Sequence, residues 1–294
     1  MMGAFEGYRT SFALDRSGEQ SKTMKLALWQ TAGFPAQPAA NLRALESTAR
    51  AAAAAGAALL LCPECWLCGY NIGAEVAKLA ESRAGHAAQV IADIARRNQL
   101  AIAYGYAERD PADGTIYNAV QVIGPDGVRL AHYRKTHLFG PDERAAYRPG
   151  GCFEAPFELG GFRIGLLICY DVEYPEAVRS LALLGAEVVL VPTALTDEYT
   201  AIPELIVPAR AIENQVFVAY CNHAGVENGM RFLGGSRLSD IDGRPITAAG
   251  AGEALLVGEI SQEKRRAAAA VYPYKVDRRP ELYGLLTSNS GGQC

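Results

Sequence analysis

Three residues of complementary chemistry each follow an apolar run of the sequence. Glu64 stands in the string CPECWLCGYN, directly after the run Leu59–Cys62. Lys135 stands in HYRKTHLFG at the end of another run, and Cys169 ends the apolar string RIGLLIC. Functional groups of α/β proteins gather where strands end and loops begin. We therefore expect a carboxylate, an ammonium and a thiol to meet in one cleft.

Together these groups suit nucleophilic attack on an amide or nitrile carbon. A cysteine thiol with an ordinary pKa of about 8.5 is mostly protonated at neutral pH, so it needs a base or positive surroundings. Glu64 is placed to take that proton, and burial would raise its pKa toward a useful value. A helix expected to begin near Pro175 would favour the thiolate through its dipole. Lys135 and the backbone N–H of Tyr170 are candidates to stabilise the negative charge that develops on the attacked group.

The elements that must position these residues alternate between strand and helix. Asn41 is a plausible N-cap for the first helix, and Gly56 lies just past its end. Apolar periodicity and helix-ending residues predict the following helices: 41–55, 86–97, 175–184 and 203–214. Buried apolar runs predict the following strands: 26–29, 58–62, 101–106, 115–123, 128–134, 163–169, 187–191, 216–222 and 253–260. No helix or strand is expected after residue 260.

The turn residues predict the fold class. Gly124–Gly127 (GPDG) and Asp242-Gly243 are hairpin signals, so antiparallel pairs must accompany the strands that helices connect. The predicted helices can cover only one face of each sheet. We therefore expect an α/β protein built as a four-layer αββα sandwich, with two mixed β-sheets inside and helices on the outer faces.

Composition restricts the class of protein further. The 294 residues include 28 Lys and Arg against 32 Asp and Glu, a net charge of −4 that argues against nucleic acid or an anionic membrane as partner. The longest apolar stretch, Ala51–Cys62, is shorter than the ~20 residues that span a bilayer. Seven cysteines and an N-terminus without a basic start and apolar core predict a cytoplasmic protein.

The predicted regular elements also divide the chain. Residues 1–23 are expected to be a flexible N-terminal extension. Residues 24–284 are expected to form a single domain with a C-terminal arm, and residues 285–294 a loose tail.

Three strings of this sequence resemble a known family. CPECWLCGYN, YRKTHLFGPDE and GLLICYDVEYPE are similar, in order, to the signature segments of the nitrilase (carbon–nitrogen hydrolase) superfamily. The resemblance runs from about residue 24 to residue 259 and implies the αββα fold. It also implies a catalytic triad of Glu64, Lys135 and Cys169 that requires no metal or organic cofactor. A second glutamate that orients the triad is matched to Glu143, and the adjacent Asp142 is the alternative match.

Further strings resemble one branch of this superfamily. GYNIG, IYNAVQVIGPDG, RKTHLFG and PARAIENQ are similar to the branch of 5-aminopentanamidases and (R)-stereoselective amidases. The resemblance implies a small-molecule substrate, an aliphatic or amino-acid-derived amide, hydrolysed to carboxylate and ammonia through a thioester. It also implies a homodimer or higher oligomer, with residues 272–283 reaching across to the partner. Six residues are candidates to line the substrate pocket or to be hydrogen-bonded loop residues: Tyr70, Asn71, Tyr117, Asn118, Thr193 and Ala194.

Other interpretations of the same residues remain open. A nitrilase or an N-carbamoyl amide hydrolase would use the same triad. Cys62, Cys65 and Cys68 form C-x-x-C-x-x-C, which suggests a metal-binding module, but no fourth ligand follows at a regular spacing. His132 and His137 flank Lys135 and suggest a Cys–His hydrolase, although His137 is better explained as a structural hydrogen-bonding residue.

Overall fold

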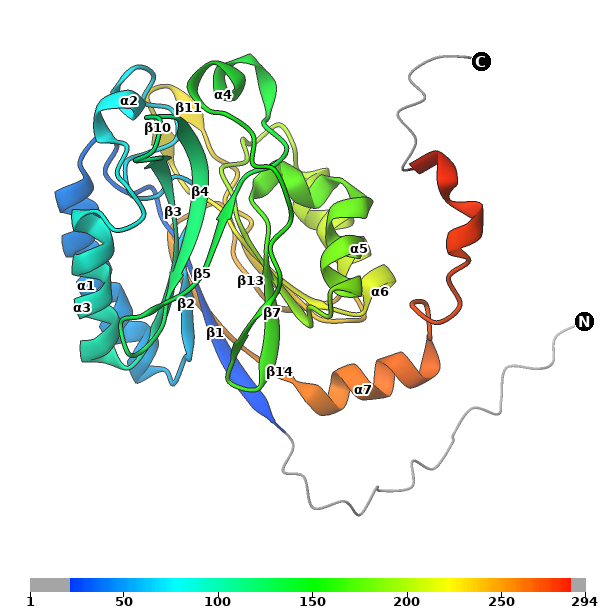
Figure 1. The fold of residues 1–294 in the computed structure, drawn as a ribbon. Helices are drawn as coiled ribbons and strands as arrows, with labels where there is room; N and C mark the ends of the chain where they lie inside the picture. Colours follow the sequence, from blue (N-terminus) through cyan, green and yellow to red (C-terminus); the bar gives the residue numbers. More distant parts are fainter. Residues whose placement is uncertain (1–21, 287–294) are drawn as a thin grey trace, which may run out of the picture.

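Two six-stranded sheets packed face to face form the body of the protein (Figure 1). The computed structural model describes residues 22–286. The first sheet has the order β14 (Ala254–Ser261), β1 (Thr23–Gln30), β2 (Leu59–Leu61), β3 (Ala101–Arg109), β4 (Ile116–Ile123), β5 (Arg129–Arg134). The second has the order β13 (Pro245–Ala248), β12 (Arg237–Ser239), β9 (Phe217–Cys221), β8 (Val188–Pro192), β7 (Phe162–Leu166), β6 (Phe157–Leu159). A separate two-stranded ribbon consists of β10 (Val226–Glu227) and β11 (Met230–Arg231).

Helices cover the outer face of each sheet. The α-helices are α1 (Pro38–Ala54), α2 (Glu75–Leu79), α3 (His86–Asn98), α4 (Gly140–Ala146), α5 (Pro175–Leu183), α6 (Val207–Asn214) and α7 (Gln262–Val271). Figure 1 shows α1 and α3 beside the first sheet and α5 and α6 beside the second, with both sheets between them. The predicted αββα sandwich of two mixed sheets is therefore confirmed. Within residues 22–286, no helix has the length and apolar character needed to cross a membrane.

Both sheets have the same internal pattern. Strands β1, β2 and β3 are parallel, and antiparallel strands flank them on both sides. In the second sheet β7, β8 and β9 are parallel, with β6 and β12 antiparallel at their flanks. The carboxyl ends of the parallel strands in a sheet all lie at one edge, which is where loops can assemble a site.

Side-chain alternation along the first sheet separates two cores. On β2, Leu59 and Leu61 face the layer between the sheets, whereas Leu60 packs beneath helices α1 and α3. On β3, Ala101 and Ala103 lie in the inter-sheet core and Ile102 lies beneath the helices. Because both faces of these strands are buried, they read in the sequence as continuous apolar runs.

Several predicted element boundaries differ from the structure. Helix α1 begins at Pro38 rather than Asn41, and Gln37 is its N-cap residue. Asn41 instead lies inside the helix, where its side chain joins the backbone of Phe34 to the carbonyl of Leu67. The predicted strand 163–169 ends at Leu166, because the chain then turns into a 3₁₀ segment, η1 (Cys169–Glu173).

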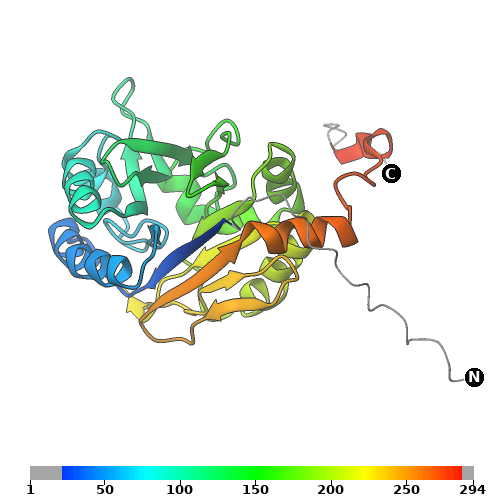
Figure 2. The same ribbon diagram turned by 90° about the horizontal axis from the view of Figure 1, so that it is seen from below.

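Two further differences concern the C-terminal half of the chain. The predicted helix 203–214 begins as one wider turn, a π-helix at Ile202–Ile206, before α6 continues it. Helix α7 follows β14, although no regular element was expected there. Beyond α7, residues 272–286 extend away from the two sheets in both views (Figures 1 and 2). The predicted N-terminal extension up to residue 21, and the predicted tail from residue 287, lie outside the described residues.

Candidate active site

Three chain segments arrive at one edge of the paired sheets. Glu64 follows β2 by three residues, and Lys135 directly follows β5. Since β4 pairs antiparallel with both β3 and β5, strand β5 runs in the same direction as β3 and ends at the same edge. Cys169 lies beyond β7 of the second sheet. Glu64 and Lys135 thus come from one sheet, and Cys169 from the sheet that faces it.

A buried ion network joins two of these segments to helix α4. The ammonium of Lys135 lies 2.6 Å from Oε1 of Glu64 and 2.7 Å from Oε1 of Glu143. The three side chains are almost completely buried. Asn118 donates a hydrogen bond of 2.7 Å to the same oxygen of Glu64. Because isolated buried charges are strongly disfavoured, this network is stable only as a unit.

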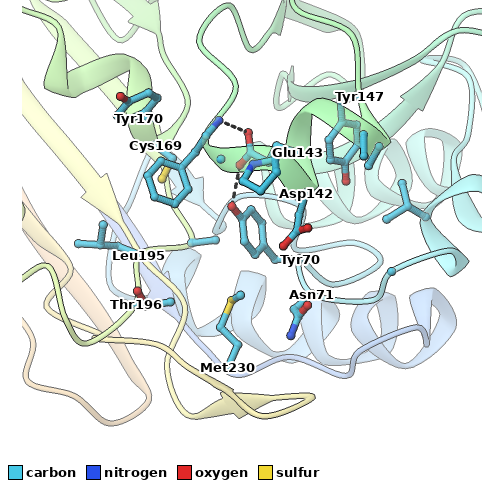
Figure 3. A pocket seen from close by; sticks show the side chains of 18 of the residues that line it. Tyr70, Asn71, Asp142, Glu143, Tyr147, Cys169, Tyr170, Leu195, Thr196 and Met230 are labelled. Carbon is cyan, nitrogen blue, oxygen red and sulfur yellow. Dashed lines mark hydrogen bonds between the residues drawn. The ribbon is translucent and has the colours of Figure 1, made fainter.

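Glu143 receives more donors than Glu64. Besides Lys135, it accepts a hydrogen bond of 2.7 Å from the hydroxyl of Tyr70 and one of 2.9 Å from the backbone N–H of Phe139 (Figure 3). Glu64, by contrast, has a buried Oε2 without any partner among the described residues. Glu143 is therefore the more fully hydrogen-bonded carboxylate of the pair. Asp142, the alternative match, is exposed and takes no part in the network.

Cys169 stands on a strained turn between strand β7 and helix α5. Its φ of 47° places it in the left-handed region, which residues with a side chain rarely adopt. Such a turn after a strand presents a nucleophile at the edge of a sheet.

The carboxylate of Asp171 ties the turn of Cys169 to the segment after Lys135. One oxygen accepts hydrogen bonds from the hydroxyl of Thr136 (3.0 Å) and from the backbone N–H of His137 (2.9 Å). The other accepts from the backbone N–H of Ile168 at 3.0 Å. His137 also bonds this carboxylate through Nδ1, at 2.8 Å. These hydrogen bonds fix the two segments relative to each other, and His137 has a structural role among them.

A cavity of about 610 Å³ lies beside Cys169 and Glu143 (Figure 3). Cys169, Tyr170 and Glu143 lie in its wall together with three of the predicted pocket residues, Tyr70, Asn71 and Ala194. Its lining also includes residues outside those six candidates: Phe139, Asp142, Glu173, Leu195, Thr196, Tyr199 and Met230. The only signal for Glu173 was its place in the string CYDVEYPE, four residues after the cysteine.

The other three predicted pocket residues lie outside this lining. Asn118 is buried behind Glu64 and donates to it. Tyr117, its neighbour on β4, points to the opposite face of the strand, where its ring stacks under the guanidinium of Arg134 at 3.8 Å. Thr193 is fully buried, and its carbonyl accepts the backbone N–H of Glu64. Asn118 and Thr193 therefore hold Glu64 in place.

Burial is the largest influence on the pKa values of Glu64 and Cys169. It raises the pKa of Glu64 to about 7, with a contribution from the charge of Glu143, while Lys135 and Asn118 oppose the shift. The pKa of Cys169 is likewise raised well above its ordinary value, first by burial and then by the charge of Glu64. Two adjacent carboxylates keep the pKa of Lys135 well above its usual range despite burial. The thiol form of Cys169 is thus favoured at neutral pH, although helix α5 begins at Pro175 as expected.

The alternative sites suggested by the sequence are not assembled in the described residues. Cys62 packs beneath the helices of the first sheet, whereas Cys65 and Cys68 belong to a separate apolar cluster. Burial raises the pKa of all three thiols. Among residues 22–286 no group of three or more His, Cys, Asp or Glu side chains is arranged to hold a metal. His132 hydrogen-bonds to Glu108.

Comparison with known proteins decides the family. The carbon–nitrogen hydrolase family model matches residues 25–270. The chain belongs to the carbon–nitrogen hydrolase family. It is an enzyme that cleaves carbon–nitrogen bonds, of the amidase type.

Individual members of the family are similar over almost the whole chain. A Pseudomonas protegens protein described as "Hydrolase in pqqF 5'region" is 46% identical, over 90% of this chain and 93% of its own. An (R)-stereoselective amidase from Pseudomonas sp. is 39% identical, over 92% of this chain and 97% of its own. The crystal structure of an amidase from Nesterenkonia sp. superposes with a TM-score of 0.82 and 35% identity, over 90% of this chain and 97% of that one.

Another structure of the Nesterenkonia amidase contains a covalently modified active-site cysteine. A glutamate-to-glutamine mutant of that enzyme carries the acetamide moiety of fluoroacetamide, covalently attached to its active-site cysteine. That structure has a TM-score of 0.78 and 34% identity over 90% of this chain and 96% of that one. In this carbon–nitrogen hydrolase, Cys169 lies in the wall of the cavity.

Proposed function

We propose that this carbon–nitrogen hydrolase converts small primary carboxamides to a carboxylate and ammonia through a thioester on Cys169. The observation that carries the proposal is the buried ammonium of Lys135, held between Glu64 and Glu143 beside a cavity that contains the cysteine. The similarity to the (R)-stereoselective amidase and to the Nesterenkonia amidase supports the same reaction class.

In the first step the sulfur of Cys169 attacks the amide carbon. Glu64 takes the thiol proton, since its pKa of about 7 lets it be deprotonated at neutral pH and still return the proton. Collapse of the tetrahedral intermediate breaks the C–N bond, and the proton on Glu64 goes to the leaving nitrogen. Ammonia departs, and the acyl group stays on the sulfur as a thioester.

Negative charge on the attacked oxygen needs donors in fixed positions. An ammonium has three N–H donors, and Lys135 uses two of them on Glu64 and Glu143. The third is available to the oxyanion, and the backbone N–H of Tyr170 is our second candidate donor. Removing one such donor typically costs about 3–4 kcal/mol of transition-state stabilisation.

Water completes the reaction. Glu64 takes a proton from a water molecule that attacks the thioester, the C–S bond breaks, and the thiol of Cys169 is regenerated with that proton. The balance is one amide and one water consumed, and one carboxylic acid and one ammonia formed. We assign Glu143 to hold Lys135, and Asn118 to orient Glu64.

The proposal predicts the effect of removing the sulfur. Cys169→Ala should release no ammonia from aliphatic amides while its thermal unfolding stays close to that of the wild type, because the change removes only one atom from the cavity wall. Cys152→Ala is the matched control, since Cys152 is exposed and lies outside the cavity. Ammonia release by the Cys169→Ala enzyme, or its loss in the Cys152→Ala enzyme, would contradict the assignment of the nucleophile.

We also propose that the chain self-associates. The arm that follows α7 has exposed apolar side chains: Tyr272, Tyr274, Val276, Leu282 and Leu286. A concentration of large exposed apolar side chains in one segment is typical of an interaction site. A second copy of the chain is the partner that the family resemblance implies, as a homodimer or a larger homo-oligomer.

A further inference from the structure

The turn that carries Glu64 is bonded to the opposite sheet through its own backbone. Its carbonyl oxygen accepts a hydrogen bond of 2.7 Å from Nε2 of His223, and its N–H donates to the carbonyl of Thr193 at 3.4 Å. Thr193 directly follows β8, and His223 follows β9, both strands of the second sheet. Glu64 therefore comes from one sheet, while its backbone is held by the sheet that also carries Cys169.

The imidazole of His223 is itself held in place. The side chain is buried and lies outside the lining of the cavity that contains Cys169. Its ring stacks on the ring of Phe232, with a centroid distance of 4.9 Å and an interplanar angle of 28°. The backbone of His223 pairs with Thr31, which follows β1, and its N–H donates to Oδ1 of Asn222 at 2.9 Å. His223 thus joins the ends of strands from both sheets.

Burial keeps this imidazole neutral. It lowers the pKa of His223 to about 4, and the hydrogen bond to the carbonyl of Glu64 acts in the opposite direction. A neutral imidazole has a single N–H. Because a carbonyl oxygen only accepts hydrogen bonds, this N–H lies on Nε2 and is directed at Glu64. The N–H is therefore used on the backbone and is not available to a substrate.

The placement of Glu64 matters because the proposed base must reach the thiol of Cys169. The hydrogen bond to Thr193 is long for an N–H donor, whereas the one from His223 has the length of a strong hydrogen bond. His223 is therefore the firmer of the two backbone restraints. A displacement of about 1 Å in an active site can cost about 100-fold in rate.

We infer that His223 is a positioning residue for the proposed amide hydrolysis, because its Nε2–H holds the carbonyl of Glu64 and so sets the carboxylate of Glu64 against the thiol of Cys169. This inference rests on the proposed function. His223 lies outside the cavity and takes no part in proton transfer. The role belongs to the N–H donor rather than to the packing of the ring.

Three substitutions separate the donor from the ring. His223→Gln keeps an N–H donor and removes the ring, His223→Phe keeps a ring against Phe232 and removes the donor, and His223→Leu removes both. His86→Leu is the matched control, since His86 is exposed at the beginning of α3. Thermal unfolding reports whether each variant keeps the fold. If His223→Phe does not fold, the Gln and Leu variants still compare a donor with no donor.

Two rates report the placement of Glu64. The first is kcat for ammonia release from butanamide, measured together with KM. The second is alkylation of Cys169 by iodoacetamide at pH 7, in which the sulfur displaces iodide and the thiol proton passes to Glu64. Mass spectrometry of the Cys169 peptide measures this rate, with the exposed Cys152 as internal reference. Alkylation needs no turnover, so it tests His223 independently of amide hydrolysis.

The expected losses follow the donor. His223→Leu and His223→Phe should lower both rates about tenfold or more, because Glu64 is displaced from the thiol. KM should change less than about threefold, since the residues that line the cavity are unaltered. His223→Gln and His86→Leu should stay within about threefold of the wild type in both rates. Alkylation of Cys152 should be the same in every variant.

Wild-type rates in His223→Leu and His223→Phe would overturn the inference. Equal losses in the Gln and Leu variants would also overturn it, since the donor would then not be the cause. A rise in KM with unchanged kcat would contradict it as well, because such a change belongs to substrate binding. If the wild type releases no ammonia from butanamide or any shorter primary amide while the alkylation rates differ as expected, the proposed function fails and the placement of Glu64 by His223 stands.

Discussion

Glu64 is held between influences that move its pKa in opposite directions. Burial raises it, the neighbouring charge of Glu143 raises it further, and Lys135 and Asn118 lower it, so that the carboxyl titrates at about 7. A carboxyl with the ordinary value of 4.5 would be a poor proton donor to leaving ammonia at neutral pH. The same buried environment thus supplies both the base and the acid of the proposed reaction.

This environment predicts a pH dependence. We expect kcat/KM for a neutral amide to fall below about pH 7, because protonated Glu64 cannot accept the thiol proton. In Glu143→Gln the acid limb should move to lower pH, since the change removes a negative charge that raises the pKa of Glu64. In Asn118→Ala the limb should move to higher pH, since a hydrogen bond that favours the carboxylate is lost.

A pH–rate profile of the three enzymes measures these shifts. The opposite directions in Glu143→Gln and Asn118→Ala serve as each other's control. An acid limb near pH 4.5 in the wild type, or shifts in the same direction in both variants, would contradict the role given to Glu64.

The sequence could not predict which way the side chains on strand β4 point. Tyr117 and Asn118 are adjacent, so on a strand they point to opposite faces. Only the register of β4 against β3 and β5 decides that Asn118 faces Glu64 and that Tyr117 faces Arg134. The sequence motif located both residues near the cluster, but no local pattern in the sequence determines that register.

The three segments that carry the proposed catalytic residues illustrate what could be predicted from the sequence. The ends of apolar runs placed Glu64, Lys135 and Cys169 at strand ends, and hairpin and helix signals predicted the mixed sheets. The turn at Cys169 was less visible, since RIGLLIC is apolar to its last residue while strand β7 ends at Leu166. Apolar periodicity reports burial, and the residues of the turn are as buried as those of the strand.

At the level of elements, strand β3 supports the turn that carries Glu64. Gly105 faces this turn so closely that an added Cβ would lie 2.5 Å from the carbonyl oxygen of Pro63 and from the backbone nitrogen of Cys65. Glycine is therefore required here by the approach of two backbone segments. The support of Glu64 thus depends on a residue that carries no chemistry of its own.

We predict that Gly105→Ala lowers both stability and activity. Overpacking of this kind typically costs about 1–3 kcal/mol, and any shift of the turn displaces Glu64. Gly151→Ala is the matched control, because its Cβ would meet no atom within 4 Å. Thermal unfolding and ammonia release measure the two effects. Wild-type activity in Gly105→Ala would show that the turn does not depend on this contact.

At the scale of the whole molecule, the paired sheets determine where the site lies. Each sheet contributes the carboxyl ends of its parallel strands to the same edge, so Cys169, which follows a strand of one sheet, lines the same cavity as Glu143 of the ion network at the other. The arm beyond α7 lies away from this edge and exposes apolar residues such as Val276, which is 83% exposed. Its composition gave no sign of this, and the expectation of a partner came from the family resemblance alone.

The arm gives a prediction about assembly. The full chain should have the mass of a dimer or a larger oligomer, and a chain ending at Val271 should be smaller, because the apolar residues of the arm would be gone. A chain ending at residue 286 is the control and should keep the full assembly. Light scattering coupled to gel filtration measures the masses. A monomeric full chain, or equal assembly of the chain ending at Val271, would show that the arm does not bind a second copy.

The covalent intermediate offers the most direct test of the account. Wild-type enzyme is mixed with a primary amide, quenched in acid during turnover, digested, and its peptides are analysed by mass spectrometry. We predict one acyl group, attached to the sulfur of Cys169, and none on the peptide that contains Cys152. Ammonia release without any acylated peptide, or with the acyl group on another residue, would contradict the thioester mechanism.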